Sequence, residues 1–266
     1  MRGAGRWAAA GLLGFTALFA AVGMFYTPYD PNAMSLVERF ALPNAKHWLG
    51  TDHYGRDVLS RMMDAAGHAY VVAVGAVGFG MAVGGLIGST AGYVKGWVGE
   101  LAIRIVDGLY AFPSLLLALL IVTVLGAGEF HALLAIGVFN VPVFARLAYS
   151  TVLETKQAGY VRAAVVYGAS RSHILLRHLF PAVLPKFAVQ AAASFSLAIL
   201  TEASLSFLGL GVQLPNASWG TMLEESRKYI SIAPWFPFVP GIAILMTALG
   251  ANLLADSYRK GGGRHV

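Results

Sequence analysis

The sequence predicts an all-α membrane protein with six transmembrane helices and both chain ends on the cytoplasmic side. Of its 266 residues, 57% are hydrophobic and 12% are charged, whereas soluble proteins contain roughly 25% charged residues. About 20 apolar residues span a bilayer as a helix, so this length accommodates roughly five to seven crossings. The apolar runs do not alternate with polar residues, as the strands of a membrane β-barrel would.

Six apolar runs are long enough to cross the bilayer, and we expect each to form a helix. They cover residues 7–26, 70–93, 101–125, 131–153, 184–209 and 234–255. The first run is longer than the core of a signal peptide, so we expect it to be retained as a helix. The chain then divides into residues 1–27 with the first helix, an outer loop at 28–69, a five-helix core at 70–259 and a cytoplasmic tail at 260–266.

The distribution of Lys and Arg predicts the orientation, because cationic loops are retained on the cytoplasmic side. With the N-terminus inside, the inner segments hold Arg2, Arg6, Lys95, Lys156, Arg162, Arg171, Arg177, Lys186, Arg259, Lys260 and Arg264. The outer segments hold the shorter set Arg39, Lys46, Arg56, Arg61, Arg227 and Lys228. The net charge of +6 is therefore attributed to topology, and no basic stripe with interleaved aromatic residues indicates nucleic-acid binding.

Several kinds of function are disfavoured by what the sequence lacks. The absence of cysteine excludes disulfides, thiol catalysis and Cys-ligated zinc. Because there is no G-x4-G-K-[ST] phosphate-binding loop, any ATP would be bound by another polypeptide. The sequence shows no nucleophile and general base that would converge in one site, so it does not indicate a membrane enzyme. A self-contained secondary transporter stays a rival, although internal repeats are not evident and it would need ion-coupling carboxylates at the bilayer midplane.

The inner segment at 154–182 is the most informative part of the chain. Its pattern predicts a helix-turn-helix lying on the membrane, with a first short helix at 160–167. Gly168 permits the sharp turn that ends this helix, and Ser170 can cap the next one. Pro181 then introduces the following transmembrane helix. A small alanine surface on such a helix suits the groove of a partner protein, but an ordinary amphipathic inner loop is the alternative.

The spacing Ala163-Ala164-x3-Gly168-x12-Pro181 resembles the "EAA" coupling loop of ABC-importer permeases. The resemblance implies that this loop docks into an ATPase subunit and transmits ATP-driven closure to the membrane helices. Arg162 stands where the family loop usually has Glu, and Phe180 replaces the usual Leu. The candidate coupling residues are Tyr160, Arg162, Ala163, Ala164, Gly168, Ala169, Ser170, His178 and Pro181.

Three further segments narrow the family. Residues 47–57 read His-Trp-Leu-Gly-Thr-Asp-His-Tyr-Gly-Arg-Asp and precede Ser60-Arg61. Residues 111–114 read Ala-Phe-Pro-Ser, and residues 202–211 read Glu-Ala-Ser-Leu-Ser-Phe-Leu-Gly-Leu-Gly, followed by Ser-Trp-Gly at 218–220. Together with the coupling-loop pattern, they resemble the C-type permease subunit of the dipeptide/oligopeptide/nickel ABC importers.

This resemblance implies a type I ABC importer permease fold in a bacterial or archaeal cytoplasmic membrane. It also implies a heterodimer with a homologous second permease, two cytoplasmic ABC ATPase domains and an extracytoplasmic solute-binding protein. The chain itself would be no enzyme and would hold no cofactor, because ATP and Mg²⁺ would bind to the partner subunits. Short peptides would be the cargo, with nickel or a metal chelate as the alternative.

The outer loop carries a second group of candidate residues, for which we favour a structural role over contact with substrate. They are Gly50, Thr51, Asp52, Gly55, Arg56, Asp57 and Arg61. We expect the glycines and aspartates to form a compact turn, in which Arg56 or Arg61 pairs with Asp52 or Asp57 and holds the loop against the helices.

Three histidines, His47, His53 and His68, lie in the same predicted loop. Imidazole clusters can bind nickel or copper. Solvated or hydrogen-bonded histidines are the commoner case, so we assign no metal site.

Polar residues inside the expected helices are candidates for the substrate path, since they usually face the interior of a helix bundle. Glu202 could contact a cationic substrate or pair with an outer-loop arginine. Asn140 and Gln190 could line a path or make hydrogen bonds between helices, which is the commoner use.

Three charged residues fall inside other expected helices, and each has a local interpretation. Arg104 and Asp107 lie one turn apart, which predicts an i,i+3 ion pair. Arg146 is expected to extend its side chain toward the cytoplasmic surface.

Overall fold

The computed structural model describes residues 2–94 and 96–262 of the chain. The helices are α1 (Arg2–Gly23), the 3₁₀ turn η1 (Leu36–Glu38), α2 (Val58–Tyr93), α3 (Trp97–Tyr110), α4 (Ser114–Leu125), α5 (Glu129–Thr155), α6 (Gly159–Val166), α7 (Arg171–Ile174), the π-helical turn η2 (Leu175–Leu179), α8 (Phe180–Phe207), α9 (Trp219–Lys228) and α10 (Phe238–Gly262). The prediction of an all-helical protein is confirmed for this part of the chain. The inner cations Lys95 and Arg264, and residues 263–266 of the predicted tail, lie outside the described residues.

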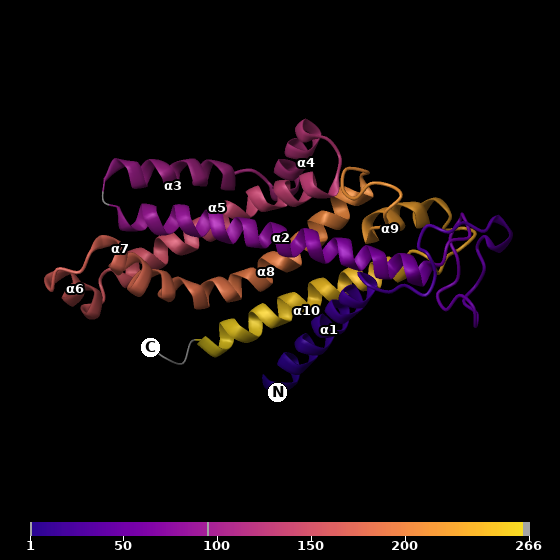
Figure 1. The fold of residues 1–266 in the computed structure, drawn as a ribbon, viewed down its shortest axis with the longest axis horizontal. Coiled ribbons are helices and arrows are strands. Elements are labelled where there is room, and N and C mark those ends of the chain that lie inside the picture. The colour runs from indigo at the N-terminus through magenta and orange to yellow at the C-terminus, as the bar shows by residue number, and fades with distance from the viewer. Residues whose placement is uncertain (1, 95, 263–266) are drawn as a thin grey trace.

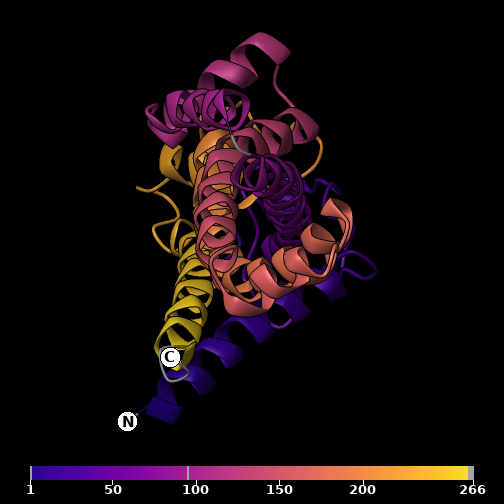
Figure 2. The ribbon, with the colours of Figure 1, turned by 90° about the vertical axis from the view of Figure 1, so that its left-hand side faces the viewer.

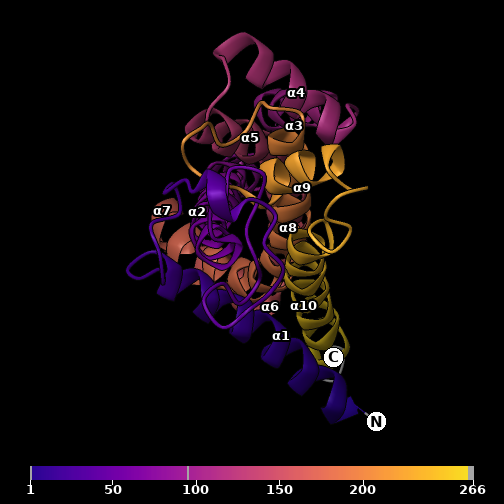
Figure 3. The same ribbon diagram turned by 90° about the vertical axis from the view of Figure 1, so that its right-hand side faces the viewer.

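The helices α2, α5 and α8 pack on one another and run along the long axis of the molecule (Figure 1). At one end of this axis lie α6 and α7, and at the other lies the segment 24–57, which we call the outer segment. Figures 2 and 3 look along the axis and show α3 and α4 on one side of the bundle and α1 with α10 on the other. The two groups of candidate residues therefore occupy opposite ends of the bundle.

Four helical stretches in the described residues are long and apolar enough to cross a membrane. They are Val58–Tyr93, Glu129–Thr155, Ser172–Phe207 and Phe238–Arg259. The helices α3 and α4 make a fifth span if the bent pair counts as one, and α1 contributes a shorter apolar stretch, Trp7–Gly23.

The single helix expected over residues 101–125 is broken in the structure, so that prediction was wrong. The axes of α3 and α4 are bent by 92° at residues 111–113. Pro113 disfavours helical backbone at Phe112 and lacks the N–H that would continue the helix, and its own ψ of 128° is extended. The sequence therefore contained the signal for the break, Pro113, but the continuous apolar pattern on both sides of it indicated a single helix.

The helix expected from residue 70 begins earlier, at Val58. Asp57 caps it by accepting hydrogen bonds from the Ser60 backbone N–H and hydroxyl at 2.8 and 2.7 Å. Hydropathy placed this boundary too late because the first turns carry Arg61, Asp64 and His68, which read as loop residues. In the fold, Arg61 is fully buried.

The α2–α5 contact depends on small residues that let two backbones approach closely. Gly80, Gly84 and Gly88 recur every four residues on the α2 face toward α5. A Cβ at Gly84 would overlap the Val141 carbonyl oxygen, and one at Gly88 would overlap the Ala145 carbonyl oxygen. This spacing is typical of closely packed helices in membranes.

Gly84→Ala is therefore expected to destabilise the fold by about 1–3 kcal/mol, because the added methyl group must push two backbones apart. Gly78 on the same helix is the matched control, since nothing lies within 4 Å of a Cβ built there. Gly78→Ala should leave stability unchanged or raise it by up to about 1 kcal/mol through helix propensity. Thermal unfolding in detergent measures both, and equal shifts would contradict this packing.

Candidate functional site

The inner candidate site is built by α6, which the sequence predicted at 160–167 and the structure has at Gly159–Val166. Gly168, with φ of +78°, makes the turn after it in a conformation that favours glycine. The Ser170 hydroxyl then accepts a hydrogen bond from the His173 backbone N–H at 3.3 Å. Local residues thus specify the helix-turn-helix.

Two buried side chains anchor this helix-turn-helix to the bundle. Val161 of α6 and Ile174 of α7 are each only 2% exposed and belong to the same hydrophobic core as α2, α5 and α8. The rest of α6 projects outward, with Val166 and Tyr167 exposed by 83% and 89%. Exposed apolar side chains next to a firmly anchored turn are typical of a surface that a partner covers.

The predicted coupling residues lie around this projecting surface. Tyr160, Arg162 and Ala163 are exposed on α6, and Ala164 is half-buried. The His178 ring lies 5.9 Å from the Tyr160 ring, so η2 contacts the start of α6. The others follow the chain out of the helix: Gly168, Ser170 and Pro181 are exposed, and Ala169 is half-buried.

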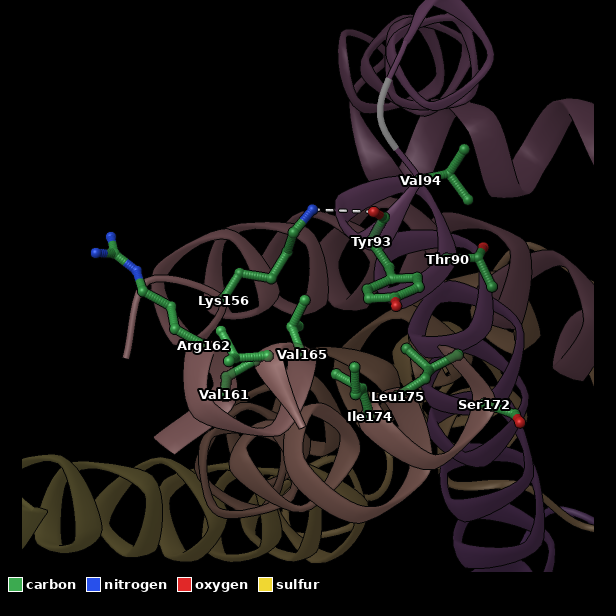
Figure 4. Close-up of a pocket in the computed structure, with 11 residues that line it drawn as sticks. Thr90, Tyr93, Val94, Lys156, Val161, Arg162, Val165, Ser172, Ile174 and Leu175 are labelled. Carbon is green, nitrogen blue, oxygen red and sulfur yellow. Dashed lines mark hydrogen bonds between the residues drawn. The ribbon is translucent and has the colours of Figure 1, made fainter. Parts of the chain in front are cut away.

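A cavity of about 810 Å³ lies between α6 and α7 and the ends of α2 and α5 that are nearest to them (Figure 4). Lys156 spans it by donating hydrogen bonds to the Tyr93 and Gly92 carbonyl oxygens at 2.9 and 3.1 Å. An ammonium group is favourable at the carbonyl end of a helix. Arg162 extends away from the other labelled side chains in Figure 4, which leaves its guanidinium available to a partner.

At the opposite end of the bundle, the buried residues Asp52, Arg56 and Arg61 and the half-buried Glu225 form what we call the outer ion cluster. The Arg56 Nε–H donates to Asp52 Oδ2 at 2.6 Å, and Arg61 Nε lies 3.5 Å from the same oxygen. Both guanidinium groups also reach Glu225, at 3.2 and 3.5 Å. The cluster therefore fastens the outer segment to α2 and α9.

The sequence indicated Asp52 with the two arginines but missed Glu225. This residue lies on α9, far along the chain from Arg56, and no local pattern marks it. The outer turn itself follows from nearby residues, since Gly50 and Gly55 both have φ of +74° and Thr51 pairs with Asp57 in an isolated bridge.

The three histidines of the predicted outer loop have separate partners. His47 Nδ1 lies 2.8 Å from Asp57 Oδ1, and His68 Nδ1 lies 3.0 Å from Glu129 Oε2. His53 packs between the rings of Tyr54 and Tyr229, and its burial lowers its pKa below the usual value. They are thus not gathered into one imidazole site.

One group among the described residues brings potential metal ligands together: Asp52, His53 and Glu225, with ligand atoms within 4.8 Å of one another. Both carboxylates in this group already face Arg56 and Arg61. A divalent cation would be repelled by the two guanidinium groups, so the residues fit a metal poorly.

Two of the three predicted path residues, Glu202 and Asn140, are buried inside the subunit. Glu202 is fully buried and accepts a hydrogen bond from the Ser206 hydroxyl at 2.7 Å, and not from an outer-loop arginine. Asn140 is 1% exposed and donates to the Ile136 carbonyl oxygen at 2.9 Å. Gln190 is half-buried and reaches Ser194 on its own helix at 3.4 Å. In this conformation neither Glu202 nor Asn140 reaches the subunit surface.

The local pair expected between Arg104 and Asp107 is replaced by a contact between helices. The Arg146 Nε–H donates to Asp107 Oδ1 at 2.6 Å, which joins α5 to α3. The guanidinium also lies 4.5 Å from the centre of the Tyr110 ring. Arg146 therefore pairs across the helices while its side chain stays 46% exposed.

Comparison with known proteins places this arrangement in a family. The family model described as "Binding-protein-dependent transport system inner membrane component" matches residues 84–260, which include α6. The chain is 38% identical over 250 residues to the "Probable D,D-dipeptide transport system permease protein DdpC" of Escherichia coli strain K12, covering 91% of this chain and 84% of that protein.

Two further relatives have similar coverage. The "Dipeptide transport system permease protein DppC" of Alkalihalophilus pseudofirmus is 41% identical over 217 residues, covering 82% of this chain and 71% of the relative. The "Glutathione transport system permease protein GsiD" of Pectobacterium atrosepticum is 38% identical over 255 residues, covering 94% and 84%. The expected resemblance is confirmed, and the chain belongs to the binding-protein-dependent transport inner membrane components, the membrane permeases of ABC importers.

Proposed function

We propose that this chain forms half of the translocation path for di- and oligopeptides in an ATP-driven importer. The names of relatives that transport D,D-dipeptides, dipeptides and glutathione support this cargo. A homologous second permease completes the path, and an extracytoplasmic solute-binding protein delivers the peptide. Two cytoplasmic ABC domains bind and hydrolyse ATP with Mg²⁺, while this chain supplies no catalytic residue and holds no cofactor.

The observation that carries the proposal is the combination of a projecting α6 surface with buried anchors. An ATPase that binds to Tyr160, Ala163 and Tyr167 would contact one face of α6, while the other face packs into the core through Val161. Movement of the ATPase then moves this helix. The chain continues from α6 back into α5 on one side and through α7 and η2 into α8 on the other. Movement of α6 is therefore passed to two transmembrane helices at once.

This connection accounts for alternating access. ATP binding closes the ATPase domains and draws the α6 helices of the two permeases together, which opens the path outward, and hydrolysis returns it to the inward-open state. The Lys156 hydrogen bonds to the end of α2 couple a third helix to the same movement. Arg162 offers a cation to the ATPase where the family loop usually has an acid.

The same proposal fixes the orientation in a bacterial or archaeal cytoplasmic membrane. In this proposal the six crossings are the four long apolar helices α2, α5, Ser172–Phe207 and α10, the bent pair α3–α4 counted as one span, and the shorter α1. Both chain ends and α6 then lie in the cytoplasm, where ATP is available. The outer segment and α9 face the solute-binding protein.

Uptake competition tests the cargo. The complete importer, with its second permease, ATPases and cognate binding protein, is reconstituted in proteoliposomes, and uptake of a labelled dipeptide is measured. Because substrate and competitor share one path, a hundredfold excess of unlabelled dipeptide should reduce uptake by at least about tenfold, and NiCl₂ should not. Uptake of ⁶³Ni²⁺ that dipeptides do not inhibit would instead support the metal alternative.

A further inference from the structure

A strip of exposed and half-buried polar side chains runs along α3 and α5, which pack on one another. Asp107 and Arg146 form its centre, with side chains exposed by 42% and 46%. On α3, Glu100 and Arg104 continue the strip toward the start of the helix, and on α5, Ser150 continues it toward the end. These residues recur at spacings of three and four, which places them on one face of each helix.

The centre of the strip lies within the apolar stretches of both helices. Asp107 is about 15 Å from the start of α3, and Arg146 is about 14 Å from the end of α5, at a rise of 1.5 Å per residue. Both distances are measured from the end of the bundle that carries α6. Each corresponds to between two and three helical turns, so the pair does not lie at the polar ends of these helices.

The strip ends in a cavity at the end of the bundle that carries α6. This cavity has a volume of about 430 Å³ and is lined in part by Glu100, Tyr149, Lys156 and Gln157. Polar groups therefore continue from the inner end of the bundle to the Arg146–Asp107 pair.

A charged pair within the apolar part of a membrane helix is costly in lipid, about 2.5–3.5 kcal/mol for each residue on insertion scales. Such residues almost always face a bundle interior or a water-filled cavity. The neighbouring exposed residues of α4 are apolar, with Leu116, Leu120 and Val124 exposed by 59%, 60% and 78%. The strip is thus chemically distinct from the adjoining surface, which suits lipid or another apolar helix.

The geometry at Arg146 favours binding of an anion. Asp107 engages Nε, and Tyr110 supports the guanidinium from its ring face, so the side chain is held in one orientation. The Arg146 side chain as a whole is 46% exposed, and a guanidinium binds carboxylate groups through paired N–H donors. The buried Glu202 and Asn140 offer a passing solute no comparable contact.

We propose that this strip lines the water-filled cytoplasmic half of the translocation path and that Arg146 binds the carboxylate group of the transported solute. The carboxylate part rests on the proposed function, because a peptide with a free C-terminus supplies that group. The water-filled part does not depend on the cargo.

Cysteine labelling tests the water-filled path directly, because the chain has no native cysteine. Gly108→Cys probes the centre of the strip, where a Cβ meets nothing within 4 Å. Leu120→Cys on the apolar surface of α4 and the fully buried Ala148→Cys are the controls. In the assembled importer without ATP, a charged, membrane-impermeant methanethiosulfonate added from the cytoplasmic side should label Gly108→Cys at least tenfold faster than either control. Equal, slow labelling would overturn the proposal.

Protection of the same cysteine tests the binding role. Millimolar Ala-Ala on the cytoplasmic side should slow labelling of Gly108→Cys several-fold, and Ala-Ala amide should not. Adding Arg146→Gln should abolish this protection, whereas Arg146→Lys should retain part of it because the charge is kept. Fast labelling without protection would overturn the carboxylate site. Neither readout uses transport, so failure of peptide import is detected separately by uptake competition.

Discussion

Asp52→Ala is expected to destabilise the protein by about 3–5 kcal/mol, the typical cost of removing one partner from a buried ion pair. Asp52 is fully buried, and its carboxylate accepts hydrogen bonds from the Arg56 side chain and from the Tyr54 and Arg56 backbone N–H groups. Without it, the two buried guanidinium groups of the outer ion cluster share a single carboxylate, that of Glu225. The attachment of the outer segment should therefore be lost first.

Thermal unfolding of the detergent-purified chain and protease cleavage within residues 24–57 measure this effect. Lys46→Ala is the matched control, since it removes the exposed ion pair of Lys46 with Glu38 in the same segment, and exposed pairs contribute little. Asp52→Asn should fall between the two because it keeps hydrogen bonding and loses the charge. If Asp52→Ala unfolds no earlier than Lys46→Ala, the cluster does not hold the outer segment.

Ala164→Glu is expected to reduce ATP-driven uptake by at least tenfold, equivalent to about 1.4 kcal/mol, while leaving membrane insertion intact. Ala164 is half-buried on the α6 surface. A longer charged side chain at this position would project into the ATPase that we propose docks on that surface. The fold should survive, because the α6 anchor Val161 is unchanged. ATP hydrolysis by the partner subunits should then proceed without matching transport.

The ratio of peptide uptake to ATP hydrolysis in proteoliposomes is the relevant measurement. Ala45→Glu makes the same substitution at an exposed alanine of the outer segment and should keep the wild-type ratio. Co-purification of the ATPases with the Ala164 variant shows whether docking or only coupling is lost. Unchanged uptake together with unchanged ATPase association would rule out docking through this face.

The parts of the structure that depend on near neighbours were predictable from the sequence. The turn that follows α6 depends on Gly168 and Ser170. The predicted boundaries of α6 itself were correct to within one residue at each end. Helix composition follows from the long apolar runs, and family membership follows from motifs contained in short segments.

Contacts between distant parts of the chain were not predictable in the same way. Glu225 joins the outer ion cluster only because α9 folds back against α2, and Asp107 meets Arg146 because α3 packs on α5. In both cases a partner nearby in the sequence was the simpler expectation. The break at Pro113 was missed for another reason. Hydropathy reports how apolar a segment is, and it does not register the backbone N–H that proline lacks.

The central claim is that this chain is one half of a path driven by a separate motor that acts through α6. The most direct test is peptide uptake into proteoliposomes containing the chain alone, the chain with its second permease, or the complete importer with ATPases and binding protein. Uptake should occur only in the complete importer and only with ATP, and Ala164→Glu should reduce it there by at least tenfold. ATP-independent uptake by the chain alone, as a secondary transporter would show, would contradict the account.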